Sequence, residues 1–264
     1  MCYWPVFAAN HADLAKPYVR HFWNVLPVME AETRRIWQRP GVKIPFASVG
    51  NGIDYWGVGY WRYEHFVSAW TAQIAWWHYL HTRDESFFRS CGWPLLKAVA
   101  DFYVSYLERD KVSGKLHLPR TKVCEDTIFN MVPEQRLVTD ALNDISAVRS
   151  TLRDAAEAAR TMDDKDSAQQ YASALENLAP LPEEDGEFIP FQGCLKDVPV
   201  SHPYLIQPIY PDEHVTAVGP SSLRRVAERS LRNVWRCSSR VTKGAPHADK
   251  DQCYWNDDLS MGWL

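Results

Sequence analysis

The chain has 264 residues, of which 46% are hydrophobic and 23% are charged, and its formal net charge is −4. This composition supports an ordinary globular core and excludes a disordered chain. The negative balance provides no basic surface for nucleic acid or an anionic membrane, and no apolar run reaches the length of a bilayer span. We therefore expect neither nucleic acid nor a membrane as a partner.

The first half of the chain predicts one long helix followed by a helical hairpin. Residues 6–38 predict the long helix, which Pro17 and Pro27 are expected to break or kink. Residues 62–83 carry apolar side chains on most sides, which is typical of a helix buried between other helices. Residues 93–109 predict its partner. Asp84 is expected to cap the short turn between the two, and Pro94 is tolerated in a first helical turn.

A second hairpin is predicted from residues 139–162 and 166–178, joined by a DDKD turn. The Pro-rich residues 180–220 predict a long irregular segment. Residues 221–236 predict another helix, and a further one is expected to start within 252–264. In the helix predicted for residues 139–162, the apolar face consists of Leu142, Ile145, Val148, Leu152 and Ala155.

No segment shows the alternation of a sheet, so the fold class is predicted to be all-α. A helical solenoid would show a fixed repeat period, and none is present. The hairpins therefore favour a closed toroid.

The six cysteines are widely spaced and form no C-x-x-C pair, which indicates buried or free thiols. Asp257 and Asp258 alone make a poor cation site, so we interpret them as solvated or capping residues. Because the sequence also has no phosphate-binding loop, H-E-x-x-H or G-x-S-x-G motif, we expect no cofactor and no metal. The 12 Trp, 12 Tyr and 10 Phe fit either a large core or sugar-stacking walls.

The stretch GKLHLPRTKVCEDT, residues 114–127, interrupts the helices and presents Glu125 and Asp126. One interpretation is a solvated turn or a helix cap. The other is a general acid, because glycoside hydrolysis needs one carboxylic acid to protonate the leaving oxygen and one carboxylate to activate water. Asp126 is the weaker alternative for that role.

Three further residues are candidates for contacts with a sugar. His202 lies in the Pro-rich segment, and loops on a rigid scaffold often carry ligand contacts. Trp56 and Trp61 lie in a Gly-containing stretch that could line a cleft. For each of them a structural role in hydrogen bonding or core packing is the alternative.

Three stretches resemble glycoside hydrolase family 95, the family of α-L-fucosidases and α-L-galactosidases. YWPVFAANHADLAKPY (3–18) resembles the family's YWP segment. AWTAQIAWWHYLHTRDESFF (69–88) resembles its A-W-x-x-Q-x-x-W-x-H-Y stretch, in which Trp76 and His78 match but are interpreted as core. WPLLKAVADFYVSYL (93–107) resembles the helix that follows. The resemblance implies an (α/α)6 toroid and an inverting mechanism.

At the chemical positions the resemblance is thinner. It implies that Glu125 is the general acid, although the family's preceding Ser-Pro is missing here. VSHPYLIQPIYP (200–211) resembles the family's histidine motif, with His202 matched and Leu205 where a second His belongs. The family's paired Asn would precede Met1 and its catalytic Asp would follow Leu264. We therefore expect residues 1–264 to form a single, partial catalytic domain.

The leading hypothesis is an inverting exo-glycosidase that cleaves α-L-fucosyl or related bonds and takes a carbohydrate substrate. A phosphorylase or lyase on the same fold is the alternative enzyme; the first needs a phosphate pocket and the second a Tyr, His or Arg centre. A non-catalytic carbohydrate-binding or structural toroid is the third hypothesis. Compartment and oligomeric state stay open.

Overall fold

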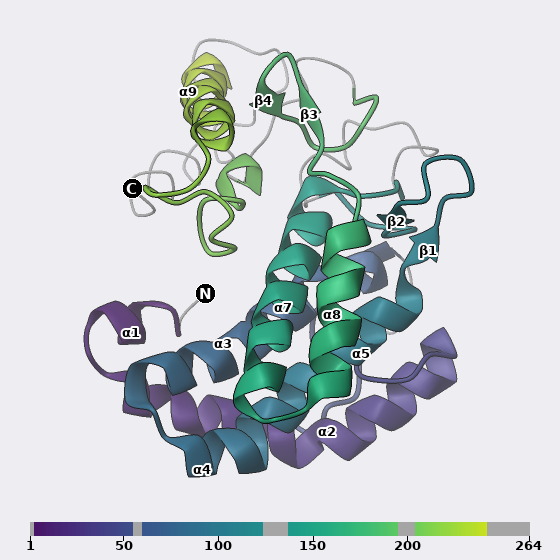
Figure 1. Ribbon diagram of the computed structural model, residues 1–264, viewed down its shortest axis with the longest axis vertical. Coiled ribbons are helices and arrows are strands. Elements are labelled where there is room, and N and C mark those ends of the chain that lie inside the picture. The colour runs from purple at the N-terminus through teal and green to yellow at the C-terminus, as the bar shows by residue number, and fades with distance from the viewer. Residues whose placement is uncertain (1–2, 55–59, 124–136, 195–203, 242–264) are drawn as a thin grey trace. The chain divides into compact units, whose positions relative to one another are not determined.

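The computed structural model describes residues 3–54, 60–123, 137–194 and 204–241 (Figure 1). The chain divides into two compact units, each described here by itself. The first unit comprises Met1–Pro119 and Ala147–Ala179, and the second comprises Arg120–Ser146 and Pro180–Leu264.

Helices build the first unit, as the sequence predicts. Its elements are α1 (Pro5–Ala8), a 3-10 turn (Ala12–Leu14), α2 (Ala15–Trp37), a 3-10 turn (Tyr60–Tyr63), α3 (Phe66–Thr82), α4 (Glu85–Phe87), a π-helical turn (Phe88–Gly92), α5 (Trp93–Tyr106), the two-residue strands β1 (Glu108–Arg109) and β2 (Leu116–His117), most of α7 (Leu142–Thr161), and α8 (Lys165–Asn177).

The predicted hairpin of α3 and α5 is confirmed, because α3 contacts both α2 and α5. Ile74 and Trp77 on the predicted stripe of α3 are buried, and so are Trp76 and His78. The predicted cap is also present, since the Asp84 carboxylate accepts a hydrogen bond from the Phe87 amide at 3.1 Å.

The long N-terminal helix differs from the prediction in where it breaks. The helix is interrupted between the end of α1 at Ala8 and the start of α2 at Ala15, and Asn10 in this interruption has a φ of 59°. Pro17 lies in the first turn of α2, where a missing N–H costs little. Pro27 lies inside α2, which continues to Trp37, so of the expected break or kink the break does not occur at Pro27.

The helices α7 and α8 form the second predicted hairpin. The chain turns back after Thr161, and the Arg149 side chain of α7 donates a hydrogen bond to the Ala179 carbonyl just beyond the end of α8. These contacts at both ends place the two helices side by side (Figure 1).

In the second unit, the first helical segment is the first turn of α7 and the last described element is α9 (Ser221–Val241). Between them lie β3 (Glu183–Glu184), β4 (Glu187–Phe188) and a 3-10 turn (Tyr204–Ile206). The segment predicted as irregular therefore contains a tight hairpin.

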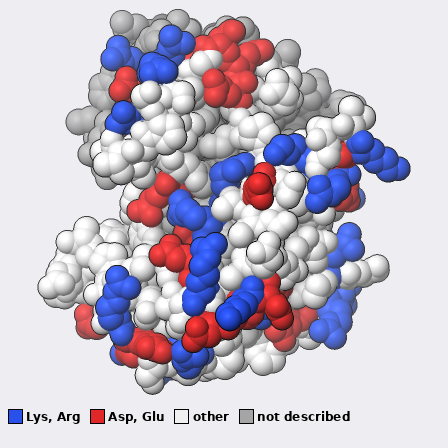
Figure 2. Space-filling view, viewed as in Figure 1, with Lys and Arg blue, Asp and Glu red and all other residues white. Residues whose placement is uncertain are grey.

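The hairpin of β3 and β4 turns through Asp185 and Gly186, which have φ values of 54° and 78°. Asp-Gly with two positive φ values is a signature of a two-residue hairpin turn. Figure 2 shows acidic side chains gathered at this hairpin, where Glu183, Glu184 and Asp185 are exposed.

The core of the second unit is one hydrophobic cluster. Its buried members are Val123, Ala141, Leu142, Phe188, Phe191, Leu205, Val226 and Ala227. Over the residues that the structure describes, no helix has both the length and the apolar character to cross a bilayer.

Candidate functional site

Four of the five predicted site residues lie outside the described residues: Trp56, Glu125, Asp126 and His202. Their roles stay predictions. The segments that flank Glu125 and His202 in the sequence are described, and both belong to the second unit.

The fifth residue, Trp61, lies in the 3-10 turn Tyr60–Tyr63 of the first unit. Its ring centroid is 5.3 Å from that of Phe46, at an interplanar angle of 33°. Trp61 is half-buried and Phe46 is 38% exposed. The pair forms a partly exposed aromatic surface, and a sugar contact of Trp61 stays a prediction.

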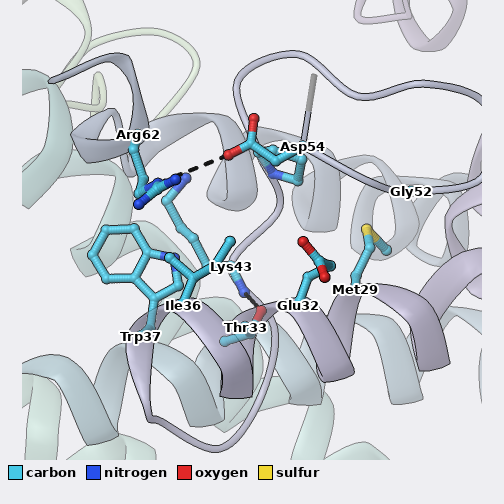
Figure 3. Close-up of a pocket in the computed structure, with 10 residues that line it drawn as sticks. Met29, Glu32, Thr33, Ile36, Trp37, Lys43, Gly52, Asp54 and Arg62 are labelled. Atoms are coloured by element: carbon cyan, nitrogen blue, oxygen red, sulfur yellow. Dashed lines mark hydrogen bonds and ion pairs between the residues drawn. The ribbon is translucent and has the colours of Figure 1, made fainter. Parts of the chain in front are cut away.

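A small cavity lies beside this turn, between α2 and the residues Lys43, Pro45, Gly52, Asp54 and Arg62 (Figure 3). Its volume is about 20 Å³, and its polar wall includes Glu32, Asp54 and Arg62. The Arg62 Nε and the Asp54 carboxylate are 3.9 Å apart across it. A cavity of this size holds a water molecule. Sugar-sized ligands need a pocket of several hundred Å³, so this cavity is not a substrate site.

The floor of the cavity is fixed by Lys43, which is 6% exposed. Its ammonium group donates hydrogen bonds to the carbonyls of Ile44 at 2.8 Å and Glu64 at 2.9 Å. The Lys43 amide donates to the Thr33 hydroxyl at 2.9 Å. These bonds tie the segment before α3 to α2.

In the second unit, the segment that leads to Glu125 is hydrogen-bonded to the residues just before α7. The amide of Thr121 donates to the Val138 carbonyl at 2.7 Å, and the Val138 amide donates back at 2.9 Å. The Thr121 hydroxyl also accepts a hydrogen bond from the Ala141 amide at 2.8 Å. The residues on either side of 124–136 are therefore paired with each other just before α7.

A buried polar network lies on the first turns of α7. The Asn143 side-chain amide donates to the Lys122 carbonyl at 3.2 Å. The main-chain carbonyl of Asn143 accepts from the Gln207 side-chain amide at 2.6 Å. The Asp212 carboxylate accepts from Gln207 at 2.9 Å and from the Ser146 hydroxyl. Because a carbonyl can only accept, the His214 Nε2 donates to Ser146 O at 2.8 Å.

The network lies almost out of solvent. Lys122, Ser146 and Asp212 are 0% exposed, Asn143 is 1% exposed and Gln207 is 3% exposed. Sequence reasoning missed it, because Asn143 and Ser146 lie off the apolar face predicted for this helix. The available signal was the position of Gln207 and Asp212, within and next to the segment that resembles the family's histidine motif.

Burial also changes the acidity of two groups in the second unit. It raises the pKa of the Tyr210 hydroxyl, with a smaller contribution from the Glu213 carboxylate. It raises the pKa of the Cys194 thiol to about 11, and Glu184 adds to the effect. Cys194 is therefore a protonated, unreactive thiol at neutral pH. Cys91 is a buried thiol, which agrees with the expectation from the spacing for this one cysteine. Within the described ranges, no group of His, Cys, Asp or Glu is arranged to hold a metal ion.

Comparison with known proteins identifies the class as a carbohydrate-active, mostly helical domain. A solved structure of a candidate kojibiose phosphorylase from the human microbiome matches with a TM-score of 0.58 at 13% identity, over 69% of this chain and 25% of that one. This similarity confirms the predicted all-α fold and is consistent with an (α/α)6 toroid.

The family follows from the sequence. The family model of the glycosyl hydrolase family 95 catalytic domain matches residues 1–232, so the chain belongs to this family. Kojibiose hydrolases of Mucilaginibacter mallensis and Flavobacterium johnsoniae are each 29% identical over 108 residues. That alignment covers 40% of this chain and 16% of either relative.

Proposed function

We propose that this chain belongs to the catalytic domain of an inverting glycosidase, in which Glu125 is the general acid. Membership of glycoside hydrolase family 95 carries the proposal. The resemblance matches Glu125 to the family's acid position and His202 to one histidine of its histidine motif. From the residues themselves, Asp126 is the weaker alternative acid, and Trp56 and Trp61 are proposed sugar contacts.

The arrangement of the second unit supports a shared site for Glu125 and His202. Val123 lies two positions before Glu125 in the sequence, and Leu205 lies three positions after His202. Both Val123 and Leu205 belong to the same hydrophobic cluster. Since a chain advances at most about 3.6 Å per residue, each candidate is tethered within a short reach of that cluster.

The proposed chemistry is proton transfer to the leaving oxygen. The Glu125 carboxylic acid protonates the glycosidic oxygen as the bond to the anomeric carbon breaks, and a water molecule attacks the opposite face. The water loses its proton to a second group, which the family resemblance places outside this chain. The acid must stay protonated near neutral pH, which requires a desolvated pocket.

The substrate is proposed as an α-linked sugar, with two candidates. The family resemblance favours α-L-fucosyl or related bonds, and the curated relatives are kojibiose hydrolases. Phosphorolysis on the same fold is the competing reaction.

The test uses the full-length natural protein with kojibiose, 4-nitrophenyl α-L-fucoside and 4-nitrophenyl α-D-glucoside, each with and without inorganic phosphate. We expect hydrolysis that does not require phosphate. Release of a sugar phosphate would establish a phosphorylase instead. No cleavage of any glycoside would favour a carbohydrate-binding or structural role.

The role of Glu125 is tested by Glu125→Gln, which keeps the shape and removes the proton. A positioned general acid contributes on the order of 10²–10⁴ in rate, so kcat for a substrate with a poor leaving group should fall by that factor. Asp126→Asn is the matched control, which should retain most of the activity. If the two results are exchanged, Asp126 is the acid.

A further inference from the structure

The buried network of the second unit joins two segments that are far apart in the sequence. Residues 120–123 lead to Glu125, and residues 204–214 follow His202. The first segment is hydrogen-bonded to Asn143 of α7, and the second is hydrogen-bonded to both Asn143 and Ser146. Asn143 and Ser146 are three positions apart and therefore neighbours on one face of the helix.

We propose that Gln207 and Asp212 are positioning residues that hold these two segments in register on α7. Their role is to keep Glu125 and His202 aligned for the same sugar. The inference rests on the proposed function, because it acts through Glu125.

The hydrophobic cluster alone would keep the segments together, since Val123, Leu142 and Leu205 all belong to it. Apolar contacts are non-directional and do not fix which carbonyl faces which amide. Burying a carboxylate has a desolvation cost, and well-packed apolar residues often give equal or greater stability. The benefit that offsets this cost is specificity, because a connected network of directional bonds defines one arrangement of the segments.

Gln207 is the central donor of the network. Its single amide group donates to the Asn143 carbonyl at 2.6 Å and to the Asp212 carboxylate at 2.9 Å. Asp212 in turn accepts from Ser146, so loss of Gln207 removes one direct bond of the 204–214 segment to α7 and one bond that orients the carboxylate of the other. The variant Gln207→Met has nearly the same length and volume but no donor.

The experiment compares leaving groups in the full-length protein. Methyl α-L-fucoside and kojibiose have poor leaving groups, whereas the corresponding 4-nitrophenyl glycosides depart with little help from an acid. If Gln207 positions the general acid, Gln207→Met should lower kcat at least ten-fold more for the poor leaving group than for the nitrophenyl one. KM should change by less than about three-fold, and Glu125→Gln should show the same bias.

Two other variants complete the test. Ser146→Ala removes one bond to Asp212 and should show a weaker bias, which provides a result even if Gln207→Met does not fold. Ser150→Ala removes a buried hydroxyl that bonds within α7, to the Ala147 carbonyl, and should show no bias.

The outcomes separate this inference from the proposed function. If Glu125→Gln shows the bias while Gln207→Met and Ser146→Ala affect both substrates equally or not at all, the network is only structural. If Glu125→Gln remains fully active on the poor leaving group, the proposed function fails, and the positioning role fails with it.

Discussion

Gly41 occupies a position that no other residue fits. Its φ is +79°, and a Cβ there would lie 2.4 Å from both the Ala98 carbonyl oxygen and the Phe102 amide nitrogen of α5. The next amide, of Val42, donates to the same Ala98 carbonyl at 2.8 Å. The close approach of this backbone to α5 therefore depends on the missing side chain.

We expect Gly41→Ala to lower the free energy of unfolding by on the order of 3 kcal/mol, because the clash involves backbone atoms that must move. Gly114 provides the control, since its φ is +69° but its surroundings are open. Gly114→Ala should cost only the backbone strain, about 1 kcal/mol. Urea unfolding of both variants measures the difference, and equal losses would contradict the steric argument.

His78 is the residue whose charge state should matter most to the first unit. It is 0% exposed and packs against the Phe87 ring at 5.1 Å. Neither ring nitrogen has a hydrogen-bond partner among the described residues. Burial lowers the pKa of His78, and the Lys16 ammonium lowers it further, while Asp84 and Asp13 oppose this effect.

A lowered pKa means that the unfolded chain binds the proton more readily than the folded one. Stability should therefore decrease as the pH falls below about 6.5, the ordinary pKa of histidine, and reach a lower plateau once the folded protein is protonated as well. His78→Leu should make the unfolding free energy less dependent on pH between 7 and 5. An unchanged pH dependence in urea titrations would show that other groups cause it.

For individual residues, the sequence predicted burial in the core better than it predicted catalytic or binding roles. Trp76 and His78 were interpreted as core residues because they lie on a helix that is apolar on most sides, and both are buried. The roles of Glu125 and His202 stay predictions from the family motif. Trp61 could be placed on a turn before a helix, but its partner Phe46 lies 15 positions away, and no periodic pattern links the two.

Among the elements, α7 shows the limit of reading a helix from its apolar face. All five predicted face residues are 0% exposed, but Asn143, Asp144 and Ser146 are buried as well. An amphipathic pattern assigns polar residues to solvent. It fails where the polar face is covered by hydrogen-bonding segments from elsewhere in the chain. The contacts of Asn143 and Ser146 with residues 204–214 are non-local and leave no periodic signal.

The contact between α5 and α8 includes a charged hydrogen bond in addition to the bond from Lys97 of α5 to Ser167 of α8. The Tyr171 hydroxyl donates to the Asp101 carboxylate at 2.6 Å, and the Tyr171 side chain is fully buried. Burial and this carboxylate raise the pKa of Tyr171, so the hydroxyl keeps its proton throughout the usual pH range. The bond is therefore always available to join the two helices.

We expect Tyr171→Phe to reduce the free energy of unfolding by about 2 kcal/mol, since a bond to a charged acceptor is lost and the ring packing is kept. Asp101→Asn, which keeps an acceptor without the charge, should cost less. A double-mutant cycle over the two positions isolates the coupling. Additive losses would mean that the Tyr171–Asp101 bond contributes nothing to the contact between α5 and α8.

For the whole molecule, the fold class was predictable because helix periodicity is local and strong. The family motifs then supplied the kind of fold that the hairpins alone only suggested. The β3–β4 hairpin was missed although its Asp-Gly turn was present, because its strands are two residues long and carry no alternation. The division into two compact units was also missed. The chain crosses between the units three times, and the crossing between Ser146 and Ala147 falls inside a continuous helix rather than in a linker.

That crossing leads to the last prediction, which concerns the expected single domain over residues 1–264. Helix formation is cooperative, and α7 contributes Leu142–Ser146 to the second unit and the rest of its length to the first. The two units should therefore unfold together. If they do, Gly41→Ala, a change in the first unit, should weaken amide protection in the second unit to the same extent. Hydrogen exchange provides the reporters: the Val42 amide, bonded to Ala98 in the first unit, and the Phe188 amide, bonded to the Ser230 hydroxyl at 2.7 Å in the second. Equal losses of protection are expected under conditions where global unfolding controls exchange. If only the first reporter is weakened, the chain consists of two independent domains, and the single-domain prediction is wrong.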